Sequence, residues 1–66
     1  MSCRALVVDD DPKILDAVGE VLRSLGHEYH TATCQEEARR CVASNHYSYY
    51  LIDLEIPVRP DHSVAR

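Results

Sequence analysis

The stretch that decides the fold reads Tyr49-Tyr50-Leu51-Ile52-Asp53-Leu54-Glu55-Ile56-Pro57. Its first four residues are apolar or aromatic, and such a run favours a strand buried on both faces, as in a parallel sheet covered by helices. The run ends on a carboxylate at Asp53, and Pro57 prevents the strand from continuing. Because ligands of such sheets bind beyond the carboxyl ends of the strands, Asp53 lies where an acidic site is expected. The alternative is an Asp that only opens a turn.

A second apolar run, at residues 5–8, ends in three acids, Asp9, Asp10 and Asp11. If the two runs form neighbouring parallel strands, Asp9, Asp10 and Asp53 lie side by side. Carboxylates that close repel one another and destabilise the fold unless a cation is present. Mg²⁺ suits such a site because it takes one or two carboxylates and keeps several waters. The alternative, a helix N-cap with favourable dipole charge, explains Asp11 but does not require the other two.

The residues after Asp11 predict a helix that starts with Pro12 at its first position and ends before Gly26. Apolar residues recur through it with helical spacing. They are Ile14, Leu15, Val18, Val21, Leu22 and Leu25.

Residues 27–32 alternate between the two faces of a half-polar strand, which is typical of a sheet edge. Thr33 and Glu36 have capping-box spacing and predict a second helix. This helix is expected to end near Asn45, a residue that can take the left-handed conformation. The third strand is predicted over residues 49–54.

The predicted order is strand, helix, strand, helix, strand. Alternation of this kind favours right-handed crossovers and a parallel α/β sheet. If the third strand pairs with the first and leaves the second outside, Asp53 lies beside Asp9 and Asp10.

The overall composition narrows the class of protein. The 66 residues are 45% hydrophobic and 27% charged with a net charge of −4, which indicates one small globular domain and argues against direct nucleic-acid binding. No apolar run approaches the roughly 20 residues of a membrane span, and no signal peptide is visible. Three cysteines without metal-type spacing favour reduced thiols and a cytoplasmic location.

Several of these motifs, in this order and spacing, resemble the N-terminal half of the receiver domain of bacterial two-component response regulators. The resemblance runs through residues 6–12, 25–26, 31–32, 36–38 and 51–57. It implies a flavodoxin-like parallel sheet with strand order 2-1-3 that lacks the last two strand–helix units. Residues 1–57 would form the partial receiver domain, and residues 58–66 a loop or tail.

The resemblance also implies a role for each acidic residue. Asp53 occupies the phosphoacceptor position, and Asp9 and Asp10 occupy the positions of the pair that binds Mg²⁺ directly or through water. Glu55 stands where the family offers a backbone carbonyl to the same metal. The implied partner is a sensor histidine kinase, and the chain would be a signalling module, not an enzyme.

The sequence also departs from the family pattern. The Ser or Thr and the Lys that contact the phosphoryl group belong to the missing half, so phosphotransfer is expected to be impaired. The alternative function is a structural half-domain that is not phosphorylated and acts as a homodimer, since its third strand or first helix would be left uncovered. A third alternative, a small metal-dependent phosphatase or phosphotransferase, lacks a second acid for proton transfer.

Overall fold

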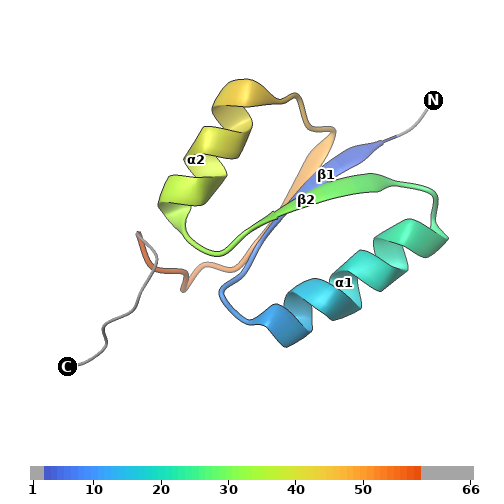
Figure 1. The fold of residues 1–66 in the computed structure, drawn as a ribbon, viewed down its shortest axis with the longest axis horizontal. Coiled ribbons are helices and arrows are strands. Elements are labelled where there is room, and N and C mark those ends of the chain that lie inside the picture. Colours follow the sequence, from blue (N-terminus) through green and yellow to red (C-terminus); the bar gives the residue numbers. More distant parts are fainter. Residues whose placement is uncertain (1–2, 59–66) are drawn as a thin grey trace.

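A computed structural model of the chain describes residues 3–58, in which strands and helices alternate. The elements are β1 (Arg4–Val8), α1 (Pro12–Ser24), β2 (Glu28–Ala32), α2 (Gln35–Ser44) and β3 (Tyr49–Ile52). The three strands form one parallel sheet in the order β2-β1-β3. The two helices lie on opposite faces of this sheet (Figure 1). The predicted α/β fold, a partial flavodoxin-like sheet with strand order 2-1-3, is therefore confirmed.

The core is built around β1, whose side chains point alternately to the two faces of the sheet. Leu6 and Val8 pack with Ala32 and Tyr47 on the face covered by α2. Ala5 and Val7 pack with Leu22 and further residues of α1 on the other face. Because both faces are covered, residues 5–8 are all buried and the strand reads as a continuous apolar run.

Helix α1 begins and ends as its sequence predicts. The Asp11 side chain accepts a hydrogen bond of 2.9 Å from the Lys13 backbone N–H, and Pro12 occupies the first helical position. Within the helix, a Cβ atom at Gly19 would collide with the ring of Tyr29 on β2. Gly19 therefore lets the helix approach the sheet, at a cost of up to ~1 kcal/mol in helix propensity relative to Ala.

Gly26 ends α1 in the left-handed region, with a φ of 78°. A Cβ atom at Gly26 would lie in open space, so only the backbone conformation disfavours a substitution there. We expect Gly26→Ala to lower the free energy of unfolding by about 1–2 kcal/mol, the cost of a left-handed L-residue. Urea denaturation followed by circular dichroism measures the free energy of unfolding. Ala17→Gly, a substitution in the interior of α1, is the control. An unchanged midpoint for Gly26→Ala would contradict the prediction.

Helix α2 is capped differently from the prediction. The Thr33 backbone N–H and hydroxyl both donate to Glu37 Oε1 at 2.8 Å, so Glu37, and not Glu36, is the partner of Thr33. These two hydrogen bonds, the backbone one first, lower the pKa of Glu37 below its usual value. The N-cap residue is Cys34, which contributes no side-chain hydrogen bond.

The first backbone N–H groups of α2 instead find their hydrogen-bond acceptors in the loop that follows β3. The backbone N–H groups of Gln35 and Glu36 donate to the carbonyl oxygens of Pro57 and Val58, at 2.9 and 2.8 Å. This contact ties the segment after Asp53 to α2. The predicted tail, residues 58–66, lies outside the described residues except for Val58.

Asn45 ends α2 in an extended conformation, with a φ of −138°, so the prediction of a left-handed residue was wrong. Its backbone N–H and its side-chain amide both donate to the Cys41 carbonyl oxygen, at 2.9 and 3.1 Å. Because the end of the helix is satisfied in this way, the chain needs no left-handed residue before it enters β3.

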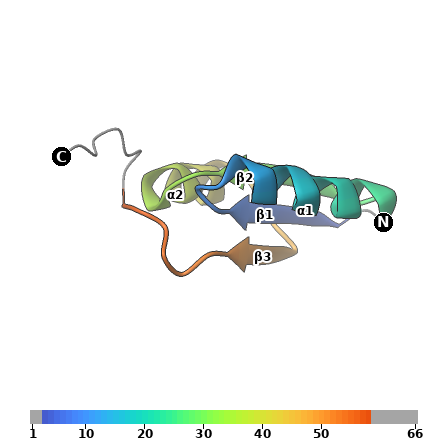
Figure 2. The same cartoon turned by 90° about the horizontal axis from the view of Figure 1, so that it is seen from below.

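Strand β3 lies at the edge of the sheet. Figure 2 shows both helices beside β2 and β1, with β3 projecting beyond them. Tyr50, Leu51 and Ile52 are 46, 41 and 53% exposed. Their apolar run predicted that this strand would be buried on both faces. Within residues 3–58 this prediction is wrong, because neither helix packs along β3. In the same part of the chain, neither helix combines the length and apolar character required to cross a membrane.

Candidate metal and phosphoryl site

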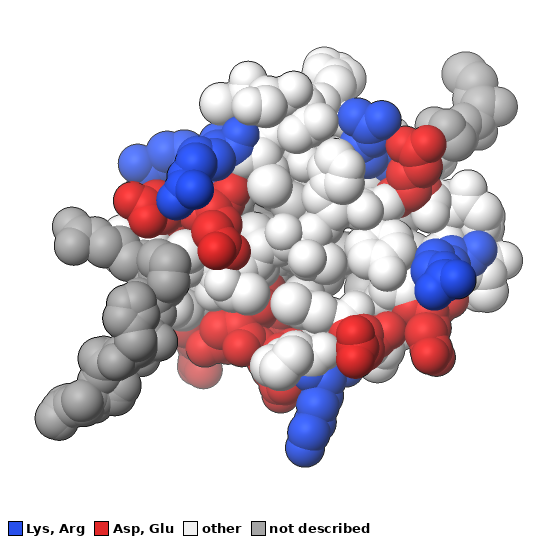
Figure 3. Space-filling model, viewed as in Figure 1, with Lys and Arg blue, Asp and Glu red and all other residues white. Residues whose placement is uncertain are grey.

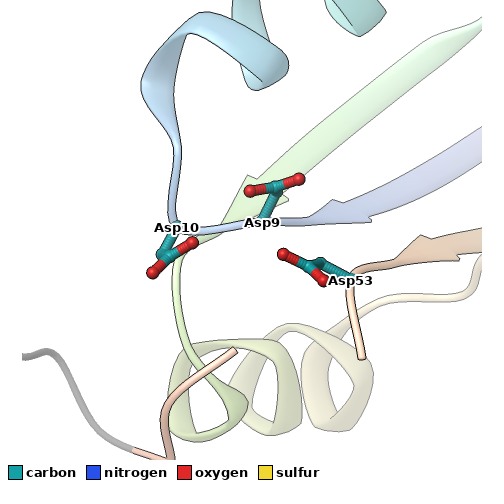
Figure 4. A group of neighbouring side chains, drawn as sticks. All are labelled: Asp9, Asp10 and Asp53. Carbon is teal, nitrogen blue, oxygen red and sulfur yellow. The ribbon is translucent and has the colours of Figure 1, made fainter. Parts of the chain in front are cut away.

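Three carboxylates meet at the carboxyl ends of the two strands that the sequence singled out. Asp9 and Asp10 directly follow β1, and Asp53 directly follows β3, which pairs with β1 in parallel. One carboxylate oxygen from each residue lies within 4.8 Å of the other two. Figure 4 shows the Asp53 side chain directed toward Asp9, with Asp10 on the opposite side of the group. The structure therefore brings together all three predicted side chains.

Backbone pairing fixes how the two strands deliver these carboxylates. The register aligns Val8 with Ile52, so the residues that follow them emerge at the same level of the sheet. The Asp53 N–H still donates to the Val8 carbonyl oxygen at 2.9 Å, although Asp53 lies just beyond the strand. The position of Asp53 beside Asp9 thus follows from the hydrogen bonds of the sheet.

Local turns orient two of the three side chains. Asp9 Oδ1 accepts a hydrogen bond of 2.9 Å from the Asp11 backbone N–H, and Asp53 Oδ1 accepts one of 3.0 Å from the Glu55 N–H. Each bond spans two residues, the geometry in which Asp side chains stabilise turns. Asp53 therefore opens a turn and also faces the other two acids, so the turn does not exclude a site at this position. The sequence analysis did not identify the anchoring N–H groups, although Asp followed by a turn is their signal.

The donor set fits Mg²⁺. The three groups offer carboxylate oxygens, the kind that this hard cation prefers. Asp9 and Asp53 are partly exposed and Asp10 is exposed, which leaves room for metal-bound water. Two oxygens on opposite sides of one Mg²⁺ are about 4.2 Å apart, twice the usual bond length. Asp9, Asp10 and Asp53 are therefore close enough together to hold one such ion.

The remaining predicted ligand is the backbone carbonyl of Glu55. Its side chain is exposed, and its N–H holds the Asp53 carboxylate. Nothing tests the carbonyl as a metal ligand, so this role stays a prediction.

The surface around the site is strongly acidic. In the view of Figure 3, Asp and Glu side chains gather along the side of the molecule on which α1 lies, whereas acidic and basic side chains lie next to one another over α2. The only lysine of the sequence, Lys13, is exposed on the first turn of α1. A cation or a cationic group is therefore favoured at the acidic end of the sheet.

Fold and site together define a partial flavodoxin-like α/β unit with an acidic centre at the carboxyl ends of its strands. The chain is similar to one segment of the gliding motility regulatory protein of Myxococcus xanthus, with 36% identity over 63 residues. The match covers 96% of the chain but 8% of the relative, so the chain spans a small part of that protein. No protein-family model matches the sequence. No solved structure matches it.

Proposed function

We propose that the chain is a phosphoacceptor signalling module of the two-component type. In this proposal Asp53 receives a phosphoryl group from a sensor histidine kinase in the cytoplasm. Asp9, Asp10, Asp53 and the Glu55 carbonyl would hold Mg²⁺. The observation that supports it most is the convergence of three carboxylate oxygens, within 4.8 Å of one another, from the ends of two paired strands.

The resemblance of residues 6–57 to a receiver domain supports the same assignment, because each of the three acids falls on a functional position of that pattern. The similarity to a regulatory protein is consistent with a role in signalling.

The proposed reaction is a phosphoryl transfer between two side chains. The Asp53 oxygen that does not accept the Glu55 N–H attacks the phosphorus of a phosphohistidine. A phosphorus–oxygen bond forms as the phosphorus–nitrogen bond breaks, and the imidazole leaves with the electron pair and takes a proton from water. When bound, Mg²⁺ would neutralise charge on the carboxylates and on the transferring group. The Glu55 N–H keeps the attacking carboxylate in one orientation.

Labelling with acetyl phosphate tests this function. We expect slow, Mg²⁺-dependent addition of one phosphoryl group to the chain, detected by mass spectrometry of the intact protein. The reaction should be slow because a carboxylate needs positioned cations to react well. Asp53→Asn should abolish the label, whereas Asp16→Asn, on the exposed face of α1, should leave it unchanged.

The outcomes separate the candidate functions. A label that persists in Asp53→Asn would exclude Asp53 as the acceptor. A folded chain that takes no label at all would favour the second candidate, a half-domain that acts by association, for which the uncovered strand β3 is the supporting observation. Turnover of a phosphoester would favour the third, a metal-dependent phosphatase.

A further inference from the structure

Two pairs of His and Tyr side chains connect β2 with β3 across the central strand. His27 Nδ1 lies 2.6 Å from the Tyr49 hydroxyl oxygen, and His30 Nδ1 lies 2.7 Å from the hydroxyl oxygen of Tyr47. In both pairs the rings meet edge to face, with centroids 5.8 and 5.5 Å apart. Each His lies in or just before β2 and each Tyr in or just before β3, so both pairs span β1.

The two His–Tyr pairs lie on opposite faces of the sheet. Tyr49 packs against the core cluster beneath α1, whereas Tyr47 belongs to the cluster beneath α2. Tyr47 is buried, and the other three side chains are partly buried. Low exposure strengthens a hydrogen bond because the surroundings screen it less than bulk water does. The start of β3 is therefore held to β2 from both faces of the sheet.

The side chains of β1 and β3 do not by themselves fix the register between these strands. Register is normally set by alternation of apolar and polar residues, because a slip of one residue exchanges the two faces. Residues 5–8 and 49–52 are all apolar or aromatic, so a slip replaces one apolar side chain by another. The backbone hydrogen bonds of a parallel ladder are evenly spaced, and they can form again after a slip. The register therefore needs a further determinant.

The register of β3 decides whether the three carboxylates meet. The observed register aligns Val8 with Ile52, and it brings an oxygen of Asp53 within 4.8 Å of oxygens of Asp9 and Asp10. A strand advances about 3.3 Å per residue, so a slip of two residues would move Asp53 by roughly 6.6 Å along the sheet. The acidic site exists only in the observed register.

We infer that the two His–Tyr pairs fix the register of β3, and that their four side chains are positioning residues of the acidic site. Strand β2 supplies the reference. Its alignment with β1 is marked by Arg4, whose Nε and Nη2 both donate to Glu28 Oε1 at 3.1 and 3.0 Å from the facing position. The His–Tyr pairs then carry this alignment from β2 to β3. The inference rests on the proposed function only for the identity of the ion that the site binds.

Hydrogen exchange without metal tests the register directly. Tyr47→Phe combined with Tyr49→Phe removes both hydroxyl groups and keeps both rings, so the chain should stay folded by circular dichroism. The Asp53 N–H, which pairs β3 with β1, should exchange at least about fivefold faster. The Asp9 N–H, which pairs β1 with β2, should change by less than about twofold. A general loss of stability would accelerate both amides alike, and that result, or no acceleration, would overturn the inference.

Substitution of the His partners tests whether the hydroxyl groups act through the pairs. His27→Leu combined with His30→Leu should accelerate exchange at Asp53 as the two Phe substitutions do, because the same hydrogen bonds are lost. Asn at both positions keeps a hydrogen-bonding group near the place of Nδ1, and it should restore at least about half of the lost protection. Equal exchange rates in the Leu and Asn variants would overturn the inference.

Mg²⁺ binding, followed by the amide signal of Asp53 during a titration, is the second readout. The variant with both Phe substitutions should bind at least about threefold more weakly, because apparent affinity falls with the fraction of molecules in the competent register. Tyr50→Phe removes a hydroxyl from a tyrosine of β3 that belongs to neither pair, and it should leave the affinity within about twofold. Unchanged affinity in the double variant would overturn the inference. A wild-type chain that binds no Mg²⁺ would contradict the proposed function instead, and the exchange rates would still decide the register.

Discussion

Leu6→Ala is expected to unfold most of the protein. Leu6 is 1% exposed and packs with Val8, Ala32 and Tyr47 beneath α2. Truncating a buried Leu to Ala costs about 2–5 kcal/mol. A 66-residue chain has a total stability of only about 3–10 kcal/mol, and an uncovered sheet edge places this one in the lower part of that range. Thermal melting followed by circular dichroism measures the loss, and the expected result is a curve with little or no folded baseline at 25 °C.

Leu54→Ala is the matched control for Leu6→Ala. It removes the same atoms from a side chain that is 93% exposed, and it should change the stability by less than about 0.5 kcal/mol. A Leu6→Ala variant that melts within a few degrees of the wild type would mean that β1 is not the centre of the core.

Mg²⁺ is expected to stabilise the folded chain, because its carboxylate ligands converge only in the folded state. At a concentration ten times its dissociation constant, a ligand of this kind adds about 1.4 kcal/mol to the free energy of unfolding. For a domain of this size that corresponds to roughly 5–10 °C in melting temperature. Asp10→Asn should abolish the shift, since Asp10 supplies one of the three oxygens. A thermal melt with and without millimolar MgCl₂ measures it, at constant ionic strength.

The same substitution predicts an opposite effect in the absence of metal. Asp10 is exposed, and removing its charge relieves repulsion from Asp9 and Asp53, so metal-free Asp10→Asn should melt at a higher temperature than the metal-free wild type. Asp16→Asn, an exposed acid of α1, should retain the Mg²⁺ shift. A melting temperature indifferent to Mg²⁺ in the wild type would show that the three acids do not form a metal site.

The sequence by itself determined the elements and the position of the acidic group. The apolar runs of β1 and β3 each end on carboxylates, and two parallel strands in register must bring such endings together. The bounds of α1 were predictable as well, because Asp11, Pro12 and Gly26 act through their own backbone and side-chain preferences. These features depend on local chemistry and on the order of the strands, and both are readable from the chain.

The tertiary structure alone decided which groups form the hydrogen bonds at the N-terminus of α2. The spacing of Thr33 and Glu36 suggested a capping box, yet Glu37 accepts both hydrogen bonds from Thr33. The first N–H groups of α2 donate to Pro57 and Val58, more than 20 residues away in sequence. Their partners come from the loop after β3, so no local pattern around Thr33 could predict them.

Burial was likewise decided by the tertiary structure. The runs of β1 and β3 are similarly apolar, but residues 5–8 are buried whereas Tyr50, Leu51 and Ile52 are about half exposed. The tertiary structure also decided the pairing of His27 with Tyr49 and of His30 with Tyr47. In each pair the His Nδ1 and the Tyr hydroxyl oxygen lie close together, at 2.6 and 2.7 Å. An apolar run encodes the tendency of a strand to be covered, but the number of helices and strands beside it determines whether it is covered.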